Sequence, residues 1–163
     1  MHIESGQRSS VEALFRDEFQ RLVRSLALVD GVEQATDAVQ EAFIQADRKW
    51  RRVGSLEDPT RWVRRVALNR LLNGRRDSRR RTEILAAVRP VDETGLDPLD
   101  LDLMDGIREL PRQQRLAVCL HYLGGYSLAE VAEDLDLAPG TVKSHLHDAR
   151  KALRRTLVVA DDV

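Results

Sequence analysis

Apolar side chains recur at steps of three and four residues along most of the chain, and this spacing is the period of an amphipathic helix. The first apolar stripe ends at Asp30-Gly31 and comprises Val11, Leu14, Phe15, Phe19, Leu22, Val23 and Leu26. The second comprises Ala35, Val39, Ala42, Phe43, Ala46 and Trp50. Asp58-Pro59 caps a third helix, whose apolar residues are Trp62, Val63, Val66, Ala67 and Leu71. Three such helices can share one core, so we expect a first domain at residues 1–82.

The helical pattern is interrupted at residues 83–100. Pro90, Gly95 and Pro98 occur there among five acidic residues, which indicates an acidic linker with at most a short helix at residues 84–88. Helical spacing resumes in a second domain, at residues 101–163. We therefore predict an all-α protein in which two small helical domains are joined by the acidic linker.

A helix-turn-helix motif is predicted in the second domain. Ser127 and Glu130 have the spacing of a capping box, and a short turn at residues 136–138 precedes a helix that begins at Pro139. In such motifs the second helix enters the major groove of DNA with its N-terminus first. The residues that we expect to face DNA are Thr141, Lys143, Ser144, His145 and Arg150. The alternative is a helical hairpin used only for packing.

Charge is strongly segregated along the chain, although the formal net charge is only −1. Residues 48–82 hold 13 of the 26 basic residues and three acidic ones, and all but one of the 13 are Arg. Such a block attracts polyanions, and Arg forks onto phosphates and base edges. A solvated helical face is the alternative explanation for the charge.

A row of polar residues spaced by four lies within this basic block. Arg61, Arg65, Asn69 and Asn73 form the row, and Arg76 flanks it. Because of the spacing by four, we expect these four residues to share one face of the helix. Arginines can follow the phosphates of strand-separated DNA, while amides read an exposed base edge. Trp62 could stack on a base, but its position in the apolar stripe favours the core.

Composition narrows the class of protein further. Hydrophobic residues make up 42% of the chain, enough for a packed core, yet no apolar run has the length of a membrane span and the N-terminus lacks a signal-peptide pattern. The single Cys119, which we expect in the core, excludes an intramolecular disulfide framework and a Cys-rich metal site. We predict a cytoplasmic protein that needs no metal and no cofactor.

An acidic and amide patch is predicted on the second helix, away from its apolar stripe. It consists of Asp37, Gln40, Glu41 and Gln45. Paired carboxylates can catalyse acid–base chemistry, but the chain offers no nucleophile–base constellation and no glycine-rich phosphate loop beside them. We therefore interpret the patch as a surface that contacts another protein, and we do not expect the chain to be an enzyme.

With these motifs in order, the chain resembles a bacterial RNA polymerase sigma factor of the sigma-70 family, in its extracytoplasmic-function (ECF) group. Three segments carry the resemblance, which covers about residues 10–157. Asp37-Ala38-Val39-Gln40-Glu41-Ala42-Phe43 is similar to the family's D-x-x-Q-E-x-F run, and residues 62–69 match its W-x-x-R-x-A-x-N segment. Leu110-Pro111 with Arg115, followed by the helix-turn-helix, matches its C-terminal pattern.

The resemblance implies a role for each group of residues. It assigns the binding of core polymerase to Asp37, Gln40, Glu41 and Phe43. It assigns recognition of the downstream (−10) promoter element and support of DNA melting to Arg61, Trp62, Arg65, Asn69, Asn73 and Arg76. It assigns recognition of the upstream (−35) element to the second helix of the helix-turn-helix. In that helix His145 occupies a position at which family members commonly carry Arg.

The implied partners are core RNA polymerase, promoter DNA and an anti-sigma factor, and the implied function is that of a promoter-specificity subunit without catalytic residues. The remaining alternative is a stand-alone helix-turn-helix transcriptional regulator. Such a regulator would need a dimerisation surface and tight binding to duplex DNA without polymerase. The sequence shows no evident dimerisation helix.

Overall fold

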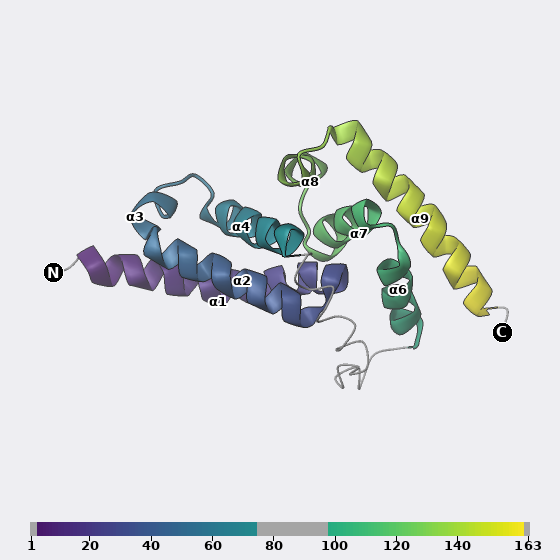
Figure 1. Cartoon of the computed structure of the whole chain (residues 1–163), viewed down its shortest axis with the longest axis horizontal. Helices are drawn as coiled ribbons and strands as arrows, with labels where there is room; N and C mark the ends of the chain where they lie inside the picture. The colour runs from purple at the N-terminus through teal and green to yellow at the C-terminus, as the bar shows by residue number, and fades with distance from the viewer. Residues whose placement is uncertain (1–2, 75–97, 162–163) are drawn as a thin grey trace.

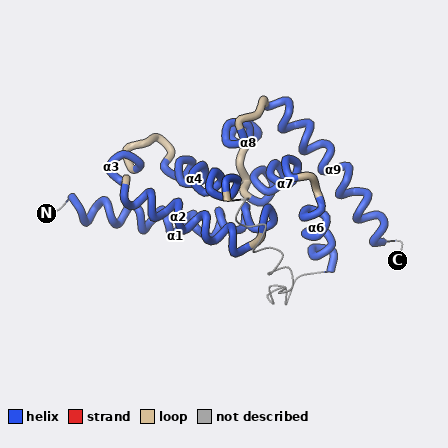
Figure 2. Tube along the Cα trace, in the orientation of Figure 1, coloured by secondary structure: helices blue, strands red, loops and turns tan. Residues whose placement is uncertain are grey.

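The computed structural model describes residues 3–74 and 98–161, and every element in these ranges is helical (Figure 1). Figure 2 shows helices joined by short loops, with no strand in the described part of the chain. The prediction of an all-α fold is therefore confirmed. The acidic linker and its short helix at residues 84–88 fall outside the described residues, except that a helix begins at Pro98.

Four helices make up the first half of the molecule: α1 (Ile3–Asp30), α2 (Val32–Arg48), α3 (Trp50–Val53) and α4 (Pro59–Asn73). Gly31 separates α1 from α2 with a φ of 107°, which lies in the region that glycine tolerates best. At the start of α4, the carboxylate of Asp58 accepts a hydrogen bond from the backbone N–H of Arg61 at 3.1 Å, and Pro59 occupies the first turn. Both predicted helix boundaries are confirmed.

Small side chains let α2 pack closely between α1 and α4. The buried residues of α2 are Ala35, Ala38, Val39, Ala42, Phe43 and Ala46. Four of these six residues are alanines, whose small side chains allow close approach. The contacts of α2 with α1 and with α4 are the two most extensive between described helices. The Phe43 ring meets that of Phe15 edge-on, with their centroids 5.1 Å apart. Phe15 is 43% exposed, although the sequence pattern placed it in the core stripe.

The second half contains α6 (Pro98–Glu109), α7 (Arg112–Val118), a π-helical turn η1 (Cys119–Leu123), α8 (Leu128–Leu135) and α9 (Pro139–Asp161). Ser127 accepts a hydrogen bond from the N–H of Glu130, and Glu130 accepts one from the N–H of Ser127, so the predicted capping box is present. The left-handed backbone of Asp136 (φ 54°) ends α8. Helices α8 and α9 thus form the predicted helix-turn-helix.

The two halves pack against each other. The C-terminal part of α1 contacts α6, α7 and η1, and Leu22, Leu26 and Val29 of α1 belong to the same buried cluster as Leu116 and Leu120 (Figure 1). Sequence periodicity does not report such packing between elements that lie far apart in the chain. Among the described helices, none combines the length and the apolar character that a membrane span requires.

The capping box makes a direct stability prediction. Replacing Ser127 with Ala removes the side-chain acceptor at the start of α8, so we expect the free energy of unfolding to fall by about 1 kcal/mol. Urea unfolding followed by circular dichroism measures this change. The matched control is Ser144→Ala, on the exposed surface of α9, where the same substitution should change stability by less than about 0.5 kcal/mol. Equal effects of the two substitutions would contradict the role assigned to Ser127.

The buried Cys119 makes a second prediction. Burial raises the pKa of its thiol to about 12, and the nearby charge of Arg115 offsets only part of that rise. Because the thiolate is the reactive form, the native protein should not react with a thiol reagent such as DTNB at about pH 8. One equivalent should react once the protein is unfolded in urea. Rapid stoichiometric reaction of the native protein would show that Cys119 is accessible.

Candidate functional site

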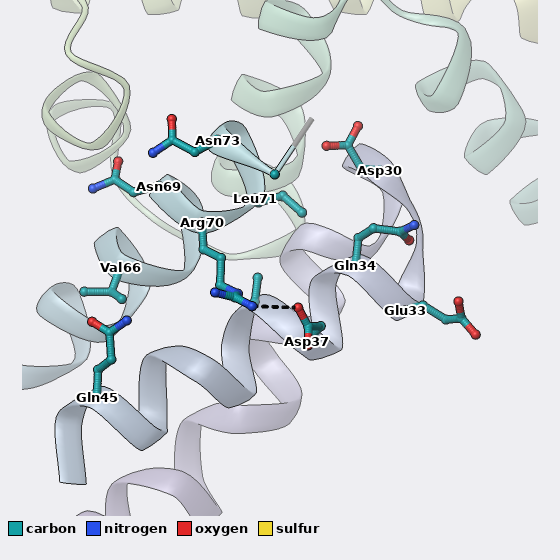
Figure 3. Close-up of a pocket in the computed structure, with 12 residues that line it drawn as sticks. Asp30, Glu33, Gln34, Asp37, Gln45, Val66, Asn69, Arg70, Leu71 and Asn73 are labelled. Carbon is teal, nitrogen blue, oxygen red and sulfur yellow. Dashed lines mark hydrogen bonds and ion pairs between the residues drawn. The ribbon is translucent and has the colours of Figure 1, made fainter. Parts of the chain in front are cut away.

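A cleft lies between α2 and α4, and polar side chains from both helices line it (Figure 3). Asn69 and Asn73 on α4 and Gln45 on α2 are among the lining residues; both asparagines are exposed, and in Figure 3 their side chains point away from α2. Arg70 crosses the cleft to Asp37, with 3.4 Å between the guanidinium and the carboxylate. Both of those side chains are largely exposed, so this ion pair contributes little to stability.

The chemistry of the cleft suits an unstacked base. Each of the three amides carries both a donor and an acceptor, which is the combination that base edges present. Val66 supplies an apolar patch beside them. The amides of Asn69, Asn73 and Gln45 therefore offer hydrogen bonds without a fixed charge, while Asp30, Glu33, Asp37 and Arg70 bring charges to the same cleft. Within the described residues, no group of three or more His, Cys, Asp or Glu side chains is placed to hold a metal ion.

The polar row on α4 does not form one surface. Residues spaced by four drift by about 40° per step around a helix, since each residue turns by about 100°. Over the three steps from Arg61 to Asn73 the direction changes by about 120°. Accordingly, Asn69 and Asn73 line the cleft, whereas Arg61 and Arg65 contact α8 in the other half of the molecule. The expectation of a shared face is wrong for the ends of the row.

Arg64 is the centre of the contact between the two halves. Its side chain is 2% exposed, and its Nε lies 2.5 Å from a carboxylate oxygen of Asp134 on α8, whose side chain is fully buried. The guanidinium also stacks on the Tyr126 ring, 3.8 Å from the ring centroid. Burial disfavours the charged form, but the hydrogen bond and charge of Asp134 outweigh it, so the pKa of Arg64 is raised. For the Tyr126 hydroxyl, by contrast, burial is itself the main cause of a raised pKa, which the nearby charges of Arg64 and Arg21 offset only in part.

The two neighbouring arginines of α4 join the same contact. Arg61 forms an ion pair with Glu133, and Arg65 donates a hydrogen bond to the backbone oxygen of Glu133 at 3.2 Å. The Nε of Arg65 lies 3.6 Å from the second oxygen of Asp134. Glu133 and Asp134 therefore engage three arginines that the charge pattern directed toward a polyanion. The acidic edge of α8, formed by Glu133 and Asp134, is the feature of the sequence from which this contact could have been expected.

A second set of contacts joins the C-terminal part of α1 to the other half. Arg112 forms two hydrogen bonds to the carboxylate of Asp30, at 2.9 and 3.0 Å. Arg115 donates to the backbone oxygen of Val29 at 2.8 Å, and Arg21 donates two hydrogen bonds to that of Gly124, at 2.9 and 2.7 Å. None of these contacts uses Arg61, Arg64 or Arg65 of α4, although the Arg21 guanidinium also lies over the Tyr126 ring, 4.9 Å from its centroid.

Gly124 fits closely beside Tyr126. A Cβ at position 124 would lie 2.6 Å from the Tyr126 ring and 2.7 Å from the backbone oxygen of Leu120. No side chain fits there unless the Tyr126 ring moves. Since Tyr126 stacks on Arg64, the turn that follows η1 controls the geometry of the contact between the halves.

Three residues of the predicted acidic and amide patch on α2 are divided between two hollows, and the fourth, Glu41, lines neither. Asp37 and Gln45 line the cleft with α4, whereas Gln40 lines a groove between α1 and α2. The groove also contains two exposed apolar side chains, Phe15 and Ile44, which are 43% and 46% exposed. Phe43 lies at the floor of this groove and is only 5% exposed, and Glu41 is half-buried. Sequence analysis did not single out Ile44.

The N-terminal part of α9 is open to solvent. Thr141, Lys143 and Ser144 are exposed and His145 is half-buried, while Val142 and Leu146 turn inward. Arg150 donates a hydrogen bond to the hydroxyl of Tyr122 at 2.8 Å. The structure thus leaves most of the predicted upstream residues accessible and ties Arg150 to a neighbouring side chain.

Two further predicted residues complete the set. Trp62 is half-buried and packs against the core, in line with the structural role that its position in the apolar stripe favoured. Arg76 lies outside the described residues.

Comparison with known families matches both halves of the chain. Residues 15–81 match the family model described as Sigma-70 region 2, and residues 100–153 match that described as Sigma-70, region 4. The ECF RNA polymerase sigma factor SigL of Mycobacterium tuberculosis is 32% identical, over 94% of this chain and 92% of that protein. SigM of the same species is 34% identical, over 94% of this chain and 80% of its own length.

Comparison with solved structures supports the fold. The sigma factor RpoE from Bartonella quintana, solved in complex with the anti-sigma factor NepR, superposes with a TM-score of 0.64. The superposition covers 89% of this chain and 97% of RpoE, at 24% sequence identity. At that level of identity the likeness speaks for a shared fold.

Proposed function

The chain belongs to the extracytoplasmic-function group of RNA polymerase sigma factors, and on this premise we propose how its surfaces divide the work of a promoter-specificity subunit. The observation that carries the function is the match of both sigma-70 regions in one chain, together with a relative that aligns over 94% of this chain. The chain is thus a specificity factor for transcription initiation. We further propose that it has no catalytic residues and acts in the cytoplasm.

Core polymerase is proposed to bind along the groove between α1 and α2. The exposed side chains of Phe15 and Ile44 are the apolar surface that a partner protein would cover. Gln40 supplies a polar contact beside them. Glu41 does not line the groove but follows Gln40 on α2 and is half-buried, and it would supply a negative charge next to the apolar surface. In this assignment Phe43 shapes the floor of the groove from below, and Asp37 acts through its ion pair with Arg70.

The downstream promoter element is proposed to bind α4. Asn69 and Asn73 would read a base exposed in the cleft, while Arg61, Arg65 and Arg76 would follow the phosphates. Trp62 would hold α4 on the core rather than stack on a base, since it packs against the core. Every residue of this group that the structure describes lies on α4, so α4 would orient the separated strand.

The upstream element is proposed to bind the N-terminal part of α9. Thr141, Lys143 and Ser144 are exposed where a recognition helix meets the major groove. His145 and Arg150 lie farther along the same helix and would contact bases or phosphates at the edge of the site. We assign the first domain to residues 1–82, the linker to residues 83–100 and the second domain to residues 101–163.

An anti-sigma factor is proposed as a further partner. The support is the structural likeness to RpoE, which was solved with the anti-sigma factor NepR. The alternative function is that of a stand-alone DNA-binding regulator. A measurement of promoter binding with and without core polymerase distinguishes a sigma factor from such a regulator. A sigma factor needs core polymerase to bind its promoter tightly, whereas a stand-alone regulator binds duplex DNA by itself and in a salt-dependent way.

Polymerase binding can be tested on α2. We expect Glu41→Lys to lower affinity for core polymerase about tenfold and Gln40→Ala to lower it severalfold, because charge reversal at an interface repels the partner and truncation removes a polar contact. Fluorescence anisotropy with labelled protein and purified core polymerase measures both affinities. The matched control is Asp17→Lys, an exposed charge reversal on α1 outside the residues that line the groove. If all three variants bind equally, the groove is not the polymerase site.

The two DNA roles can be separated in reconstituted holoenzyme. We expect Lys143→Ala to weaken promoter binding and to reduce the salt dependence of binding by about one counterion, because Lys143 would contact a phosphate. Asn69→Ala should leave initial binding nearly unchanged and slow strand opening, followed by the fluorescence of 2-aminopurine in the downstream element. Arg24→Ala, an exposed charge removal on α1, is the control. The opposite ranking of Lys143 and Asn69 would reverse the assignment.

A further inference from the structure

We propose that Asp148 on α9 determines part of the promoter specificity, by accepting a hydrogen bond from the amino group of a cytosine in the upstream element. The inference rests on the proposed function of α9 and deepens it, since it names a further residue and the base that this residue prefers. Sequence analysis did not assign Asp148 to the upstream element. Asp148 is an exposed carboxylate on the helix that we assign to duplex DNA.

The buried side of α9 determines which residues can reach DNA. Val142, Leu146 and Ala149 are at most 2% exposed, and this side packs on α6, α7 and α8. Figure 1 shows α9 along the outer edge of this half of the molecule. Since each residue turns by about 100° around a helix, Asp148 points about 130° away from the buried direction. His147 points away by about the same angle on the other side, so the outward face has two flanks.

One flank of the outward face suits phosphates. Lys143, His147 and Arg150 follow one another at steps of four and three residues, so these exposed side chains are neighbours on the helix surface. The hydroxyl of Tyr122 accepts a hydrogen bond from Arg150 at 2.8 Å and holds this guanidinium toward η1. Lysine and arginine commonly donate to DNA phosphates, and such contacts position a protein without reading sequence. This flank can therefore anchor α9 on the DNA backbone.

The other flank presents oxygen atoms. Thr141, Ser144 and Asp148 follow one another at steps of three and four residues, and all three are exposed. Within the part of the chain that the structure describes, the carboxylate of Asp148 has no ion pair or hydrogen bond, although Lys151 lies one turn farther along. A phosphate would repel this carboxylate. The partner that suits Asp148 in the major groove is therefore a hydrogen-bond donor on a base.

The edges of the bases identify that donor. An ionised carboxylate only accepts hydrogen bonds, and the donors in the major groove are the amino groups of cytosine and adenine. Adenine carries the acceptor N7 beside its amino group, and N7 repels a carboxylate. Cytosine presents its amino group without an acceptor of its own in the groove, whereas guanine presents two acceptors. Asp148 should therefore favour cytosine and discriminate most strongly against guanine.

The negative charge of Asp148 makes recognition selective rather than tight. Repulsion by the phosphates lowers the affinity of α9 for every sequence, and a cytosine at one position recovers the loss through a hydrogen bond. Specificity is a difference between affinities, so a group that weakens binding to the wrong sequences raises it. Removal of the charge should consequently strengthen binding to unselected DNA and weaken the preference for one base.

Substitutions at Asp148 test the proposal in reconstituted holoenzyme. Promoter duplexes with a randomised upstream element are selected for binding, and the affinities for all four bases at each position are then compared by competition. For the parent chain we expect one position at which cytosine is preferred over guanine by about tenfold. Asp148→Ala should reduce this preference to less than about twofold. Asp148→Asn should change the preferred base at that position to adenine, because an amide pairs with both N6 and N7 of adenine.

Asp102→Asn is the matched control, because it removes the same charge at an exposed position on α6. It should leave the base preference unchanged at every position. If both Asp148 variants also leave every preference unchanged, or strengthen binding equally for all four bases, Asp148 acts through its charge alone and the proposal is overturned. A position that prefers adenine in the parent chain and loses this preference in Asp148→Ala would overturn the assignment to cytosine.

Lys143→Ala in the same assay separates this proposal from the assignment of α9. Because Lys143 would contact a phosphate, its removal should weaken binding about equally for all sequences. Weaker binding by Lys143→Ala, combined with unchanged preferences in the Asp148 variants, overturns base recognition by Asp148 alone. If neither Lys143→Ala nor Asp148→Asn alters binding to the upstream element, α9 does not contact that element and both proposals fail.

Discussion

The stacked and paired Arg64 is the interaction on which the arrangement of the molecule depends. A guanidinium that is almost completely enclosed requires a carboxylate and a surface that tolerates its charge, and Asp134 and the Tyr126 ring supply them. Both come from the opposite half of the chain. The position of the helix-turn-helix relative to α4 is therefore set by one buried cation, with apolar packing along α1 completing the interface.

A binding protein that must meet a large enzyme and two stretches of DNA carries surfaces that can also meet each other. In this chain the basic face of α4 and the acidic edge of α8 are complementary within one molecule. The affinity of such surfaces for each other is raised by their tether, since linkage converts association into an intramolecular event. Partners must then supply enough binding free energy to replace contacts that the chain makes with itself.

Much of the fold could be predicted because its determinants are local. Gly31, the Asp58 cap and the Ser127 capping box each act within a few residues, and the periodicity between them marks the helices. The candidate site was less accessible to such reasoning. Spacing by four predicted that Asn73 and Arg61 share a face of α4. Because that face rotates along the helix, Asn73 lines the cleft with α2 whereas Arg61 pairs with Glu133 of α8. The burial of Arg64 depends on residues about 70 positions away, which no local pattern contains.

The turn after η1 gives the interface a sensitivity that lies far from any nucleic-acid contact. Gly124 leaves no room for a side chain beside the Tyr126 ring, and the ring in turn supports Arg64. A side chain at this glycine would therefore displace the Tyr126 ring and loosen its support of Arg64, so that a change in one turn would alter how the helix-turn-helix is seated on α4.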